Sequence, residues 1–586
     1  MIRDRGALKR LILAGLEGVL GPGILVALLF GASGSALLAA PAVAQEPGPG
    51  EPDPIEAGLA PTSLPYAPGI DVLHYDFELA LPETGESFLG RAQVRLALLQ
   101  PLPEVIALDL TGLAVDDVRI DGRDAPFELS GGQLRIARPA ERTRGELTVD
   151  IRYHGTPDDG LILQNTLHGR PGIFADNWPN RARFWLPTVD HPSDKATVRF
   201  TVHAPEAWQV VANGRLVQEP FATMGDALGE SANRRTWIWE AGVPISPYNM
   251  VIGATEFVVE LVGTAACGLA PLATRTDGCI EVTYWVFAPD VENASRKFAR
   301  AAQMVDFFAQ TIGPYPFEKL ANVQSSTRFG GMENASAIFY SERGIANNTT
   351  DGVVAHEIAH QWFGDAVTEA KWSHLWLSEG FATYFGNLFF EQAVSVDDFR
   401  QRMEEDRQIY IRSSVTTQPV VHEEENLFDL LNRNNYEKGG WVLHMLRGRL
   451  GDEVFFLGIR EFYRRYRHRA VLTEDFQALM EEISGQDLDW FFHQWLLEPG
   501  YPMLRISQEW VETSREIVLT VEQVQDAAWP TFRFQTEVEI ELSSGTTRTP
   551  VEISARRSVI RIEAAERPRA VRFDPDGWVL KDIETP

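Results

Sequence analysis

The sequence predicts a multidomain α+β protein in which a mostly helical segment lies between two β-rich segments. Apolar and polar residues alternate, as in half-buried strands, through much of 66–288 and 501–586, whereas helical spacing dominates 289–500. The 586 residues exceed the usual size of one domain. With 44% hydrophobic and 23% charged residues, the composition is globular and excludes a collagen-like, coiled-coil or wholly disordered chain.

The first 44 residues have the pattern of an export signal. Basic residues near the N-terminus precede an uncharged stretch of 27 residues, 18–44, which ends in an A-x-A cleavage pattern. We expect 1–44 to be a signal peptide cleaved before Gln45, which would place the protein in the periplasm or outside the cell. The alternative is an uncleaved N-terminal membrane anchor, because this stretch is long enough to cross a bilayer. Residues 45–65, rich in Pro, Gly and acids, are predicted to be a flexible leader.

Residues 66–288 are predicted to form an N-terminal β domain. Runs with strand-like alternation, separated by turn-forming pairs, occur at 74–81, 92–98, 146–153, 197–203, 235–240 and 280–287. The only two cysteines, Cys267 and Cys279, lie near its end. In an oxidising compartment they could form a disulfide that closes a short loop, and two unpaired thiols are the alternative. Two cysteines exclude a disulfide scaffold and a metal site of four thiolates.

The helical segment, 289–500, carries a metal-binding pattern. His356 and His360 enclose an H-E-x-x-H motif, which on a helix places both imidazoles on one face, within reach of one ion. Glu357 would lie beside the ion, where it could act on metal-bound water. A catalytic zinc needs a third protein ligand, and Glu379, after 18 intervening residues, is the candidate. The alternative is a helix with two surface histidines, but the apolar flanks of the motif argue against it.

A glycine-rich segment upstream of the histidines suggests a substrate contact. Residues 330–334, Gly-Gly-Met-Glu-Asn, follow a strand predicted at 321–325, and the glycines would let the backbone approach a ligand closely. Glu333 could hold a protonated α-amine by a charge-assisted hydrogen bond. Taken alone, this segment is better explained as a surface turn with an incidental acid.

After Gly500 the chain returns to strand-like alternation, and we expect a small β domain at 501–586. The net charge is −29, because 82 acidic residues outnumber 53 basic ones. This balance argues against a nucleic-acid partner, which needs clustered Lys and Arg. It identifies no substrate, since net charge reports on solubility and steering.

Taken in order, these motifs resemble the zinc aminopeptidases of the aminopeptidase N family, which also includes leukotriene hydrolase. The resemblance rests on Gly-x-Met-Glu-Asn at 330–334, on H-E-x-x-H with its following Glu, on Tyr-Glu-Lys-Gly at 436–439 and on the segment 183–192. It covers roughly residues 66–500. It implies an N-terminal β-sandwich or saddle domain, a thermolysin-like, mostly helical zinc catalytic domain and a small C-terminal β-sandwich.

The resemblance implies a role for each motif residue. His356, His360 and Glu379 would bind one zinc ion per chain. Glu357 would be the general base that activates the zinc-bound water, and Tyr436 would donate a hydrogen bond to the oxyanion. Glu333 would bind the free α-amine of a peptide, so that one residue is removed at a time. The other residues of the substrate-binding segment would be Gly330, Gly331, Met332 and Asn334.

Two positions near the motifs are less defined. Asp365 could orient a metal ligand, or it could be an ordinary carboxylate at a helix end. Relatives usually carry a second amine-binding acid or amide five residues before the position of Arg183, and here that residue is Trp178. Asp176 is the candidate substitute. We expect the large C-terminal helical domain of many relatives to be absent, which would leave a more open cleft.

Together these observations predict an exported zinc aminopeptidase that acts on peptides with a free N-terminus, with no nucleic-acid partner and no membrane contact beyond the export segment. One alternative is a thermolysin-like endopeptidase, which would have no use for Glu333. Another is an epoxide hydrolase, an activity known in one branch of the family. The last is an inactive peptide-binding module on the same fold. The joint presence of Glu357, Tyr436 and the three ligands argues against this last alternative.

Overall fold

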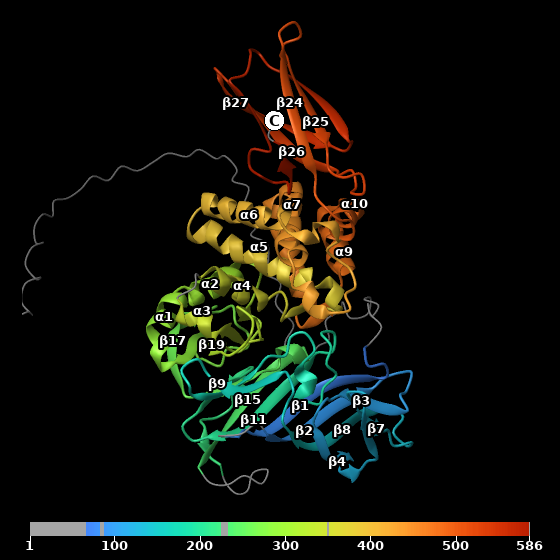
Figure 1. The fold of residues 1–586 in the computed structure, drawn as a ribbon, viewed down its shortest axis with the longest axis vertical. Coiled ribbons are helices and arrows are strands. Elements are labelled where there is room, and N and C mark those ends of the chain that lie inside the picture. The colour runs from blue at the N-terminus through green and yellow to red at the C-terminus, as the bar shows by residue number, and fades with distance from the viewer. Residues whose placement is uncertain (1–65, 83–86, 224–232, 348–350, 585–586) are drawn as a thin grey trace, which may run out of the picture. The chain divides into compact units, whose positions relative to one another are not determined.

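The computed structural model describes residues 66–82, 87–223, 233–347 and 351–584 (Figure 1). The expected signal peptide and the leader, 1–65, lie outside these residues, so their cleavage and the export of the chain stay predictions. The predicted α+β architecture is confirmed, because a β-rich region, a helical region and a second β-rich region follow one another. Among the described residues, no helix combines the length and hydropathy needed to cross a membrane.

The N-terminal region is built on a nine-stranded sheet in the order β13-β15-β11-β1-β2-β8-β4-β5, with β14 paired to β15. Burial alternates along its central strands, which places one apolar row in the core, as the sequence periodicity predicts. The sheet comprises β1 (Ile70–Ala80), β2 (Phe88–Leu98), β4 (Ala114–Ile120), β5 (Arg123–Asp124), β8 (Gly145–Gly155), β11 (Ala196–Pro205), β13 (Arg215–Leu216), β14 (Phe221–Ala222) and β15 (Arg234–Ile245).

Two smaller sheets accompany this large one, in the orders β3-β7-β6 and β12-β16-β10-β9. Their strands are β3 (Val105–Asp109), β6 (Phe127–Ser130), β7 (Gln133–Ala137), β9 (Leu161–Asn165), β10 (Pro171–Ala175), β12 (Gln209–Ala212) and β16 (Ile252–Thr255).

A five-stranded sheet, β17-β18-β19-β21-β20, joins the N-terminal region to the helical one. Its strands are β17 (Phe257–Ala265), β18 (Ile280–Phe287), β19 (Leu320–Ser325), β20 (Gly331–Met332) and β21 (Ala337–Ser341). A disulfide between Cys267 and Cys279 closes the β17–β18 connection, so the expected pairing is confirmed. Because β18 pairs in parallel with β19, the boundary predicted at 288/289 divides one sheet. This sheet places the glycine-rich segment at its edge, on β20.

The helical region contains ten α-helices among the described residues, together with a short parallel pair, β22 (Val367–Glu369) and β23 (Arg469–Val471). The long helix α5 lies close to α7, because Gly380 and Gly439 leave no side chain between them: a Cβ on Gly380 would lie 2.8 Å from the Gly439 backbone. The helices are α1 (Val291–Lys297), α2 (Ala301–Thr311), α3 (Glu342–Ala346), α4 (Gly352–His360), α5 (Trp376–Ala393), α6 (Val396–Ile411), α7 (Gly439–Leu450), α8 (Asp452–Tyr466), α9 (Thr473–Ser484) and α10 (Asp489–Phe492).

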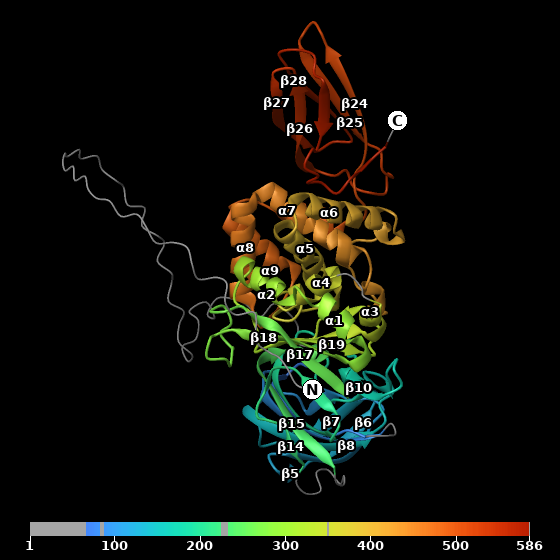
Figure 2. The same cartoon turned by 90° about the vertical axis from the view of Figure 1, so that its left-hand side faces the viewer.

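The C-terminal β region consists of two sheets, β28-β25-β24-β30 and β27-β26-β29 (Figure 2). Reciprocal hydrogen bonds between the Gln494 side chain and the Arg533 backbone, at 3.0 and 2.7 Å, connect it to the helices. The strands are β24 (Met503–Val511), β25 (Glu516–Gln523), β26 (Phe534–Leu542), β27 (Gly545–Ile553), β28 (Arg557–Glu563), β29 (Ala570–Phe573) and β30 (Asp582–Ile583).

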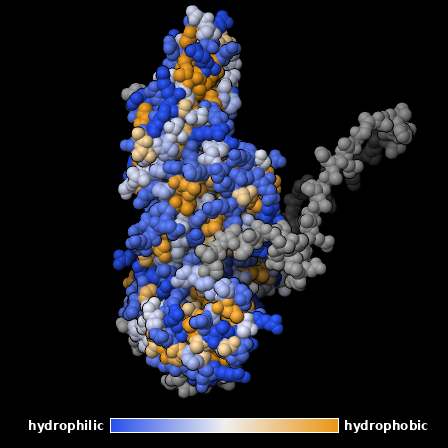
Figure 3. All heavy atoms as spheres, turned by 90° about the vertical axis from the view of Figure 1, so that its right-hand side faces the viewer, coloured by the Kyte–Doolittle hydropathy of each residue, from blue (hydrophilic) through white to orange (hydrophobic). Residues whose placement is uncertain are grey.

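The surface is mostly hydrophilic on the face that Figure 3 draws, and apolar residues form several separate patches on it. The largest buried side chains are instead aromatic and include Trp185, Trp362 and Trp376.

Candidate metal centre

Three side chains from two helices converge on one point. His356 and His360 lie on α4, and Glu379 lies in the first turn of α5. The two histidine Nε2 atoms are 3.1 Å apart, and Oε2 of Glu379 is 3.2 Å from each of them. Ligand atoms bound to a tetrahedral zinc at 2.0–2.1 Å would be separated by about 3.3 Å, so the three atoms fit three corners of such a site.

The ring of His360 is oriented for metal binding through its other nitrogen. Nδ1 donates to the carbonyl oxygen of Phe363 at 3.0 Å and lies 3.1 Å from Oγ of Ser378. A proton on Nδ1 leaves the lone pair of Nε2 free for a cation. Ser378 directly precedes Glu379, but no motif in the sequence assigns it this contact.

The electrostatics of the cluster favour an ionised Glu379. Burial opposes its charge, but the two imidazoles outweigh burial and hold the pKa of this carboxyl well below its usual value. Tyr436, in a π-helical turn at Asn434–Lys438, donates a hydrogen bond to Oε1 of Glu379 at 2.8 Å. Burial and the adjacent carboxylate raise the pKa of Tyr436 well above its ordinary value, so the phenol is neutral and can donate.

Glu357 and Glu333 lie beside the ligand cluster. One carboxylate oxygen from each, together with a ring nitrogen of His360, lie within 4.8 Å of one another. This second triad is more open than the 3.1–3.2 Å triad, which is the better match to a zinc site. Burial, opposed by His360 and reinforced by Glu379, raises the pKa of Glu333 to about 7. Gly331 is required here, because a Cβ at this position would lie 2.1 Å from Oε1 of Glu357.

These groups surround one cavity of about 410 Å³. Most of the predicted site residues line it, and they come from β20, α4, α5 and the turn before α7. Met332 and Asn334 are buried and are not among the described residues that line it. The predicted residues that do line it are Gly330, Gly331, Glu333, His356, Glu357, His360, Glu379 and Tyr436.

Two family models match this chain. The Peptidase M1 N-terminal domain matches residues 72–248, and the Peptidase family M1 domain matches residues 296–495, which contain the cavity. The chain belongs to peptidase family M1. The expected relationship to the aminopeptidase N family is therefore confirmed.

Curated relatives of this M1 chain include Probable aminopeptidase 2 of Sulfurisphaera tokodaii, 25% identical over 425 residues that cover 69% of this chain and 51% of the relative. Tricorn protease-interacting factor F2 of Thermoplasma acidophilum is 26% identical over 480 residues, which cover 78% of this chain and 56% of the relative. The chain thus spans about half the length of these relatives.

Solved structures share the M1 fold. Legionella pneumophila aminopeptidase A, in complex with aspartic acid, has a TM-score of 0.75 at 16% identity and covers 88% of this chain and 60% of its own. An M1 zinc metallopeptidase from Deinococcus radiodurans has a TM-score of 0.60 at 23% identity. The match covers 73% of this chain and 93% of the Deinococcus chain. At these identities the likeness concerns the fold.

Asp176 is placed differently from the other predicted site residues. It does not line the cavity in the described part of the chain. Its carboxylate is engaged by Nη2 of Arg181 at 2.9 Å, by Nε of Arg328 at 3.3 Å and by the Thr327 hydroxyl at 2.8 Å. In this arrangement Asp176 positions the segment that leads to the glycines, and a direct contact with a substrate amine stays a prediction.

Asp365 is hydrogen-bonded to Gln361, a residue that no sequence motif singled out. The Gln361 amide donates to Asp365 Oδ2 at 2.6 Å and to the Glu333 carbonyl oxygen at 2.7 Å. Its own oxygen accepts from the Ser336 backbone N–H at 2.8 Å. Gln361 is fully buried at the C-terminal end of α4, so its side chain ties the segment around Glu333 to that helix. In the sequence, its position directly after His360 is the one feature that could have pointed to Gln361.

Proposed function

We propose that this M1 chain is a zinc aminopeptidase that removes the N-terminal residue from peptides with a free α-amine. The observation that carries the proposal is the position of Glu333, a buried carboxylate in the same cavity as the metal-ligand triad and close to Glu357. The relatives named aminopeptidases support it. The donor set of two imidazoles and one carboxylate matches catalytic zinc sites.

Each residue would contribute a distinct step. Zinc, when bound to His356, His360 and Glu379, would supply Lewis acidity and lower the pKa of water. The Glu357 carboxylate would take a proton from the attacking water and pass it to the leaving amine.

Binding and charge stabilisation fall to two other side chains. Glu333 would hold the substrate ammonium, which fixes the N-terminal peptide bond beside Glu357 and excludes longer N-terminal extensions. The Tyr436 hydroxyl would turn from Glu379 to the oxygen that becomes negative in the transition state, a contribution on the order of 10²–10³ in rate for one such donor.

A panel of aminoacyl-coumarins, each paired with its N-acetylated form, tests the proposal. We expect cleavage of the free-amine substrates only, abolished by a chelator and restored by zinc. Cleavage of the acetylated forms would indicate an endopeptidase. Bound zinc without any cleavage would favour an epoxide substrate or a binding role.

We also propose that the chain is exported. The signal pattern of 1–44 supports this, and so does the Cys267–Cys279 disulfide, since disulfides persist in oxidising compartments. Cell fractionation with mass determination of the mature N-terminus tests it. A start at Gln45 is expected, and full-length protein in the cytoplasm would refute it.

A further inference from the structure

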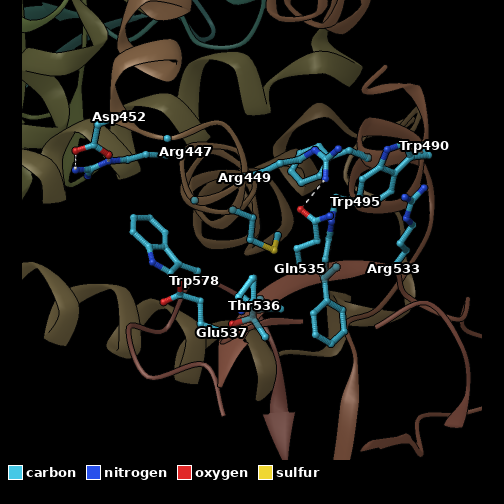
Figure 4. Close-up of a pocket in the computed structure, with 17 residues that line it drawn as sticks. Arg447, Arg449, Asp452, Trp490, Trp495, Arg533, Gln535, Thr536, Glu537 and Trp578 are labelled. Carbon is cyan, nitrogen blue, oxygen red and sulfur yellow. Dashed lines mark hydrogen bonds and ion pairs between the residues drawn. The ribbon is translucent and has the colours of Figure 1, made fainter. Parts of the chain in front are cut away.

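A second cavity lies where the helical region meets the C-terminal β region (Figure 4). It has a volume of about 360 Å³ and shares no lining residue with the metal-site cavity. One wall comes from the end of α7 and from α10, and the opposite wall comes from β26 and the loop that carries Trp578. A ligand bound here would contact both regions at once.

Two guanidinium groups of this cavity flank one indole ring. The Cζ atoms of Arg449 and Arg533 lie 4.9 and 4.6 Å from the ring centroid of Trp490, and Figure 4 shows both side chains beside it. Arg533 has an acidic partner, because its Nε contacts Oε1 of Glu552 at 2.7 Å. At the other end of the cavity, Arg447 is paired with both Glu391 and Asp452.

Arg449 makes no such ion pair within the part of the chain that the structure describes. Its one side-chain hydrogen bond among the described residues goes from Nη1 to Oε1 of Gln535 and is long, at 3.5 Å. Its Nε is buried and has no acceptor in the described part of the chain. Burial and the neighbouring Arg533 lower the pKa of Arg449, and Glu552 offsets this only in part. An anion beside the terminal nitrogens of Arg449 would supply a closer acceptor than Gln535 and offset the repulsion between the two guanidiniums.

The other lining groups restrict which anion fits. Trp490, Trp495 and Trp578 line the cavity, together with other apolar side chains, and favour a flat apolar body. Asp452 and Glu537 also line it and would repel a ligand with two negative charges. The volume lies within the range typical of small-molecule sites.

We propose that this cavity is a binding site for a small aromatic monocarboxylate, whose carboxylate pairs with Arg449 and whose ring packs among the tryptophans. The site is separate from the metal centre, so it does not depend on the aminopeptidase proposal. Occupation would stabilise the junction between α7, α10 and β26, since a ligand that binds only the folded state raises its stability.

Calorimetry with the zinc-loaded protein tests the site, with indole-3-acetate as the probe and the neutral indole-3-acetamide as its isostere. We expect the acid to bind at least tenfold more tightly than the amide and to raise the melting temperature. A hydrogen-bonded charge pair of this kind corresponds to roughly 10- to 100-fold in affinity. Equal binding of acid and amide would overturn the proposal, and so would binding of inorganic phosphate as tight as that of the acid.

Two variants locate the binding. Arg449→Gln should lower the affinity for indole-3-acetate at least tenfold and leave peptide turnover unchanged. The control, Arg561→Gln, removes an exposed guanidinium of β28 that pairs with Glu516 and does not line the cavity, and it should bind as the wild type does. Unchanged affinity of Arg449→Gln for the acid would place the acid outside this cavity. Competitive inhibition of peptide turnover, with an inhibition constant equal to the dissociation constant of the acid, would place it at the metal site. The comparison of acid and amide on the wild type decides the question even if Arg449→Gln folds poorly.

Discussion

Replacing Glu333 with glutamine should selectively impair peptides with a free N-terminus. The carboxylate is only 5% exposed and lines the metal-site cavity, so it would meet the substrate ammonium with little competition from water. Loss of a hydrogen bond to a charged group costs about 1.5–3 kcal/mol, which corresponds to roughly 10- to 150-fold in kcat/KM. The amide keeps the size of the side chain, so zinc content and melting temperature should stay close to those of the wild type.

The assay compares kcat/KM for one aminoacyl-coumarin in Glu333→Gln, in the wild type and in a control variant. Glu318→Gln is a suitable control, because Glu318 is also a buried acid, with 6% exposure, but does not line the cavity. Its turnover should stay within a factor of two or three of the wild type, roughly the scatter expected for a change away from the site. A Glu333→Gln enzyme with wild-type kcat/KM, or an equal loss of kcat/KM in the Glu318→Gln control, would refute the role of Glu333 as amine anchor.

Three further perturbations follow from the same geometry. Chelation should abolish turnover and lower the melting temperature, and zinc should restore both, because the His356, His360 and Glu379 cluster binds a cation only when folded; an unchanged melting curve would contradict this. Gln361→Leu should reduce kcat/KM at least tenfold with zinc still bound, since it frees the Glu333 segment from α4; wild-type kinetics would exclude this positioning role. Burial lowers the pKa of Lys195 to about 7, so above pH 7 the unfolded chain binds a proton there that the folded protein does not, and stability rises with pH. Relative to Lys195→Met, the free energy of unfolding of the wild type, measured in urea, should therefore rise by up to about 1.4 kcal/mol per pH unit between pH 7 and 9. A difference between the two proteins that does not change with pH would contradict the lowered pKa.

Much of the fold follows from local sequence pattern, because the hydrophobic period changes where strands give way to helices. The strand pattern predicted at 280–287 matches β18, and the helical pattern after 289 matches α1 and α2. What the pattern could not reveal is that β18 pairs with β19, more than thirty residues later in the chain. Strand pairing at that separation depends on tertiary packing and leaves no periodic signal.

The site shows the same division between local and non-local information. The two histidines converge because helical geometry alone puts positions i and i+4 on one face. Glu379 joins them only through the packing of α4 on α5. The 18 residues between His360 and Glu379 predicted this ligand because that spacing resembles the family pattern. Gln361 and Ser378 hold the site together through contacts to Glu333 and His360 that no spacing rule predicts.

The charge balance of the cavity links the metal to the substrate. Glu333, Glu357 and Glu379 are each at least 94% buried, and a group of three buried carboxylates needs compensating positive charge. Burial lowers the pKa of His360, but the neighbouring carboxylates outweigh burial and raise it well above its ordinary value, so this imidazolium supplies one positive charge. A divalent cation on the ligand triad would supply two. The ion would satisfy Glu379 and leave Glu333 short of a partner, and the ammonium of a peptide N-terminus would complete the balance. Glu357 then remains the carboxylate that can accept a proton. On this argument, binding of zinc and binding of a free amine should reinforce each other, and affinity for a free amino acid should fall when the metal is removed.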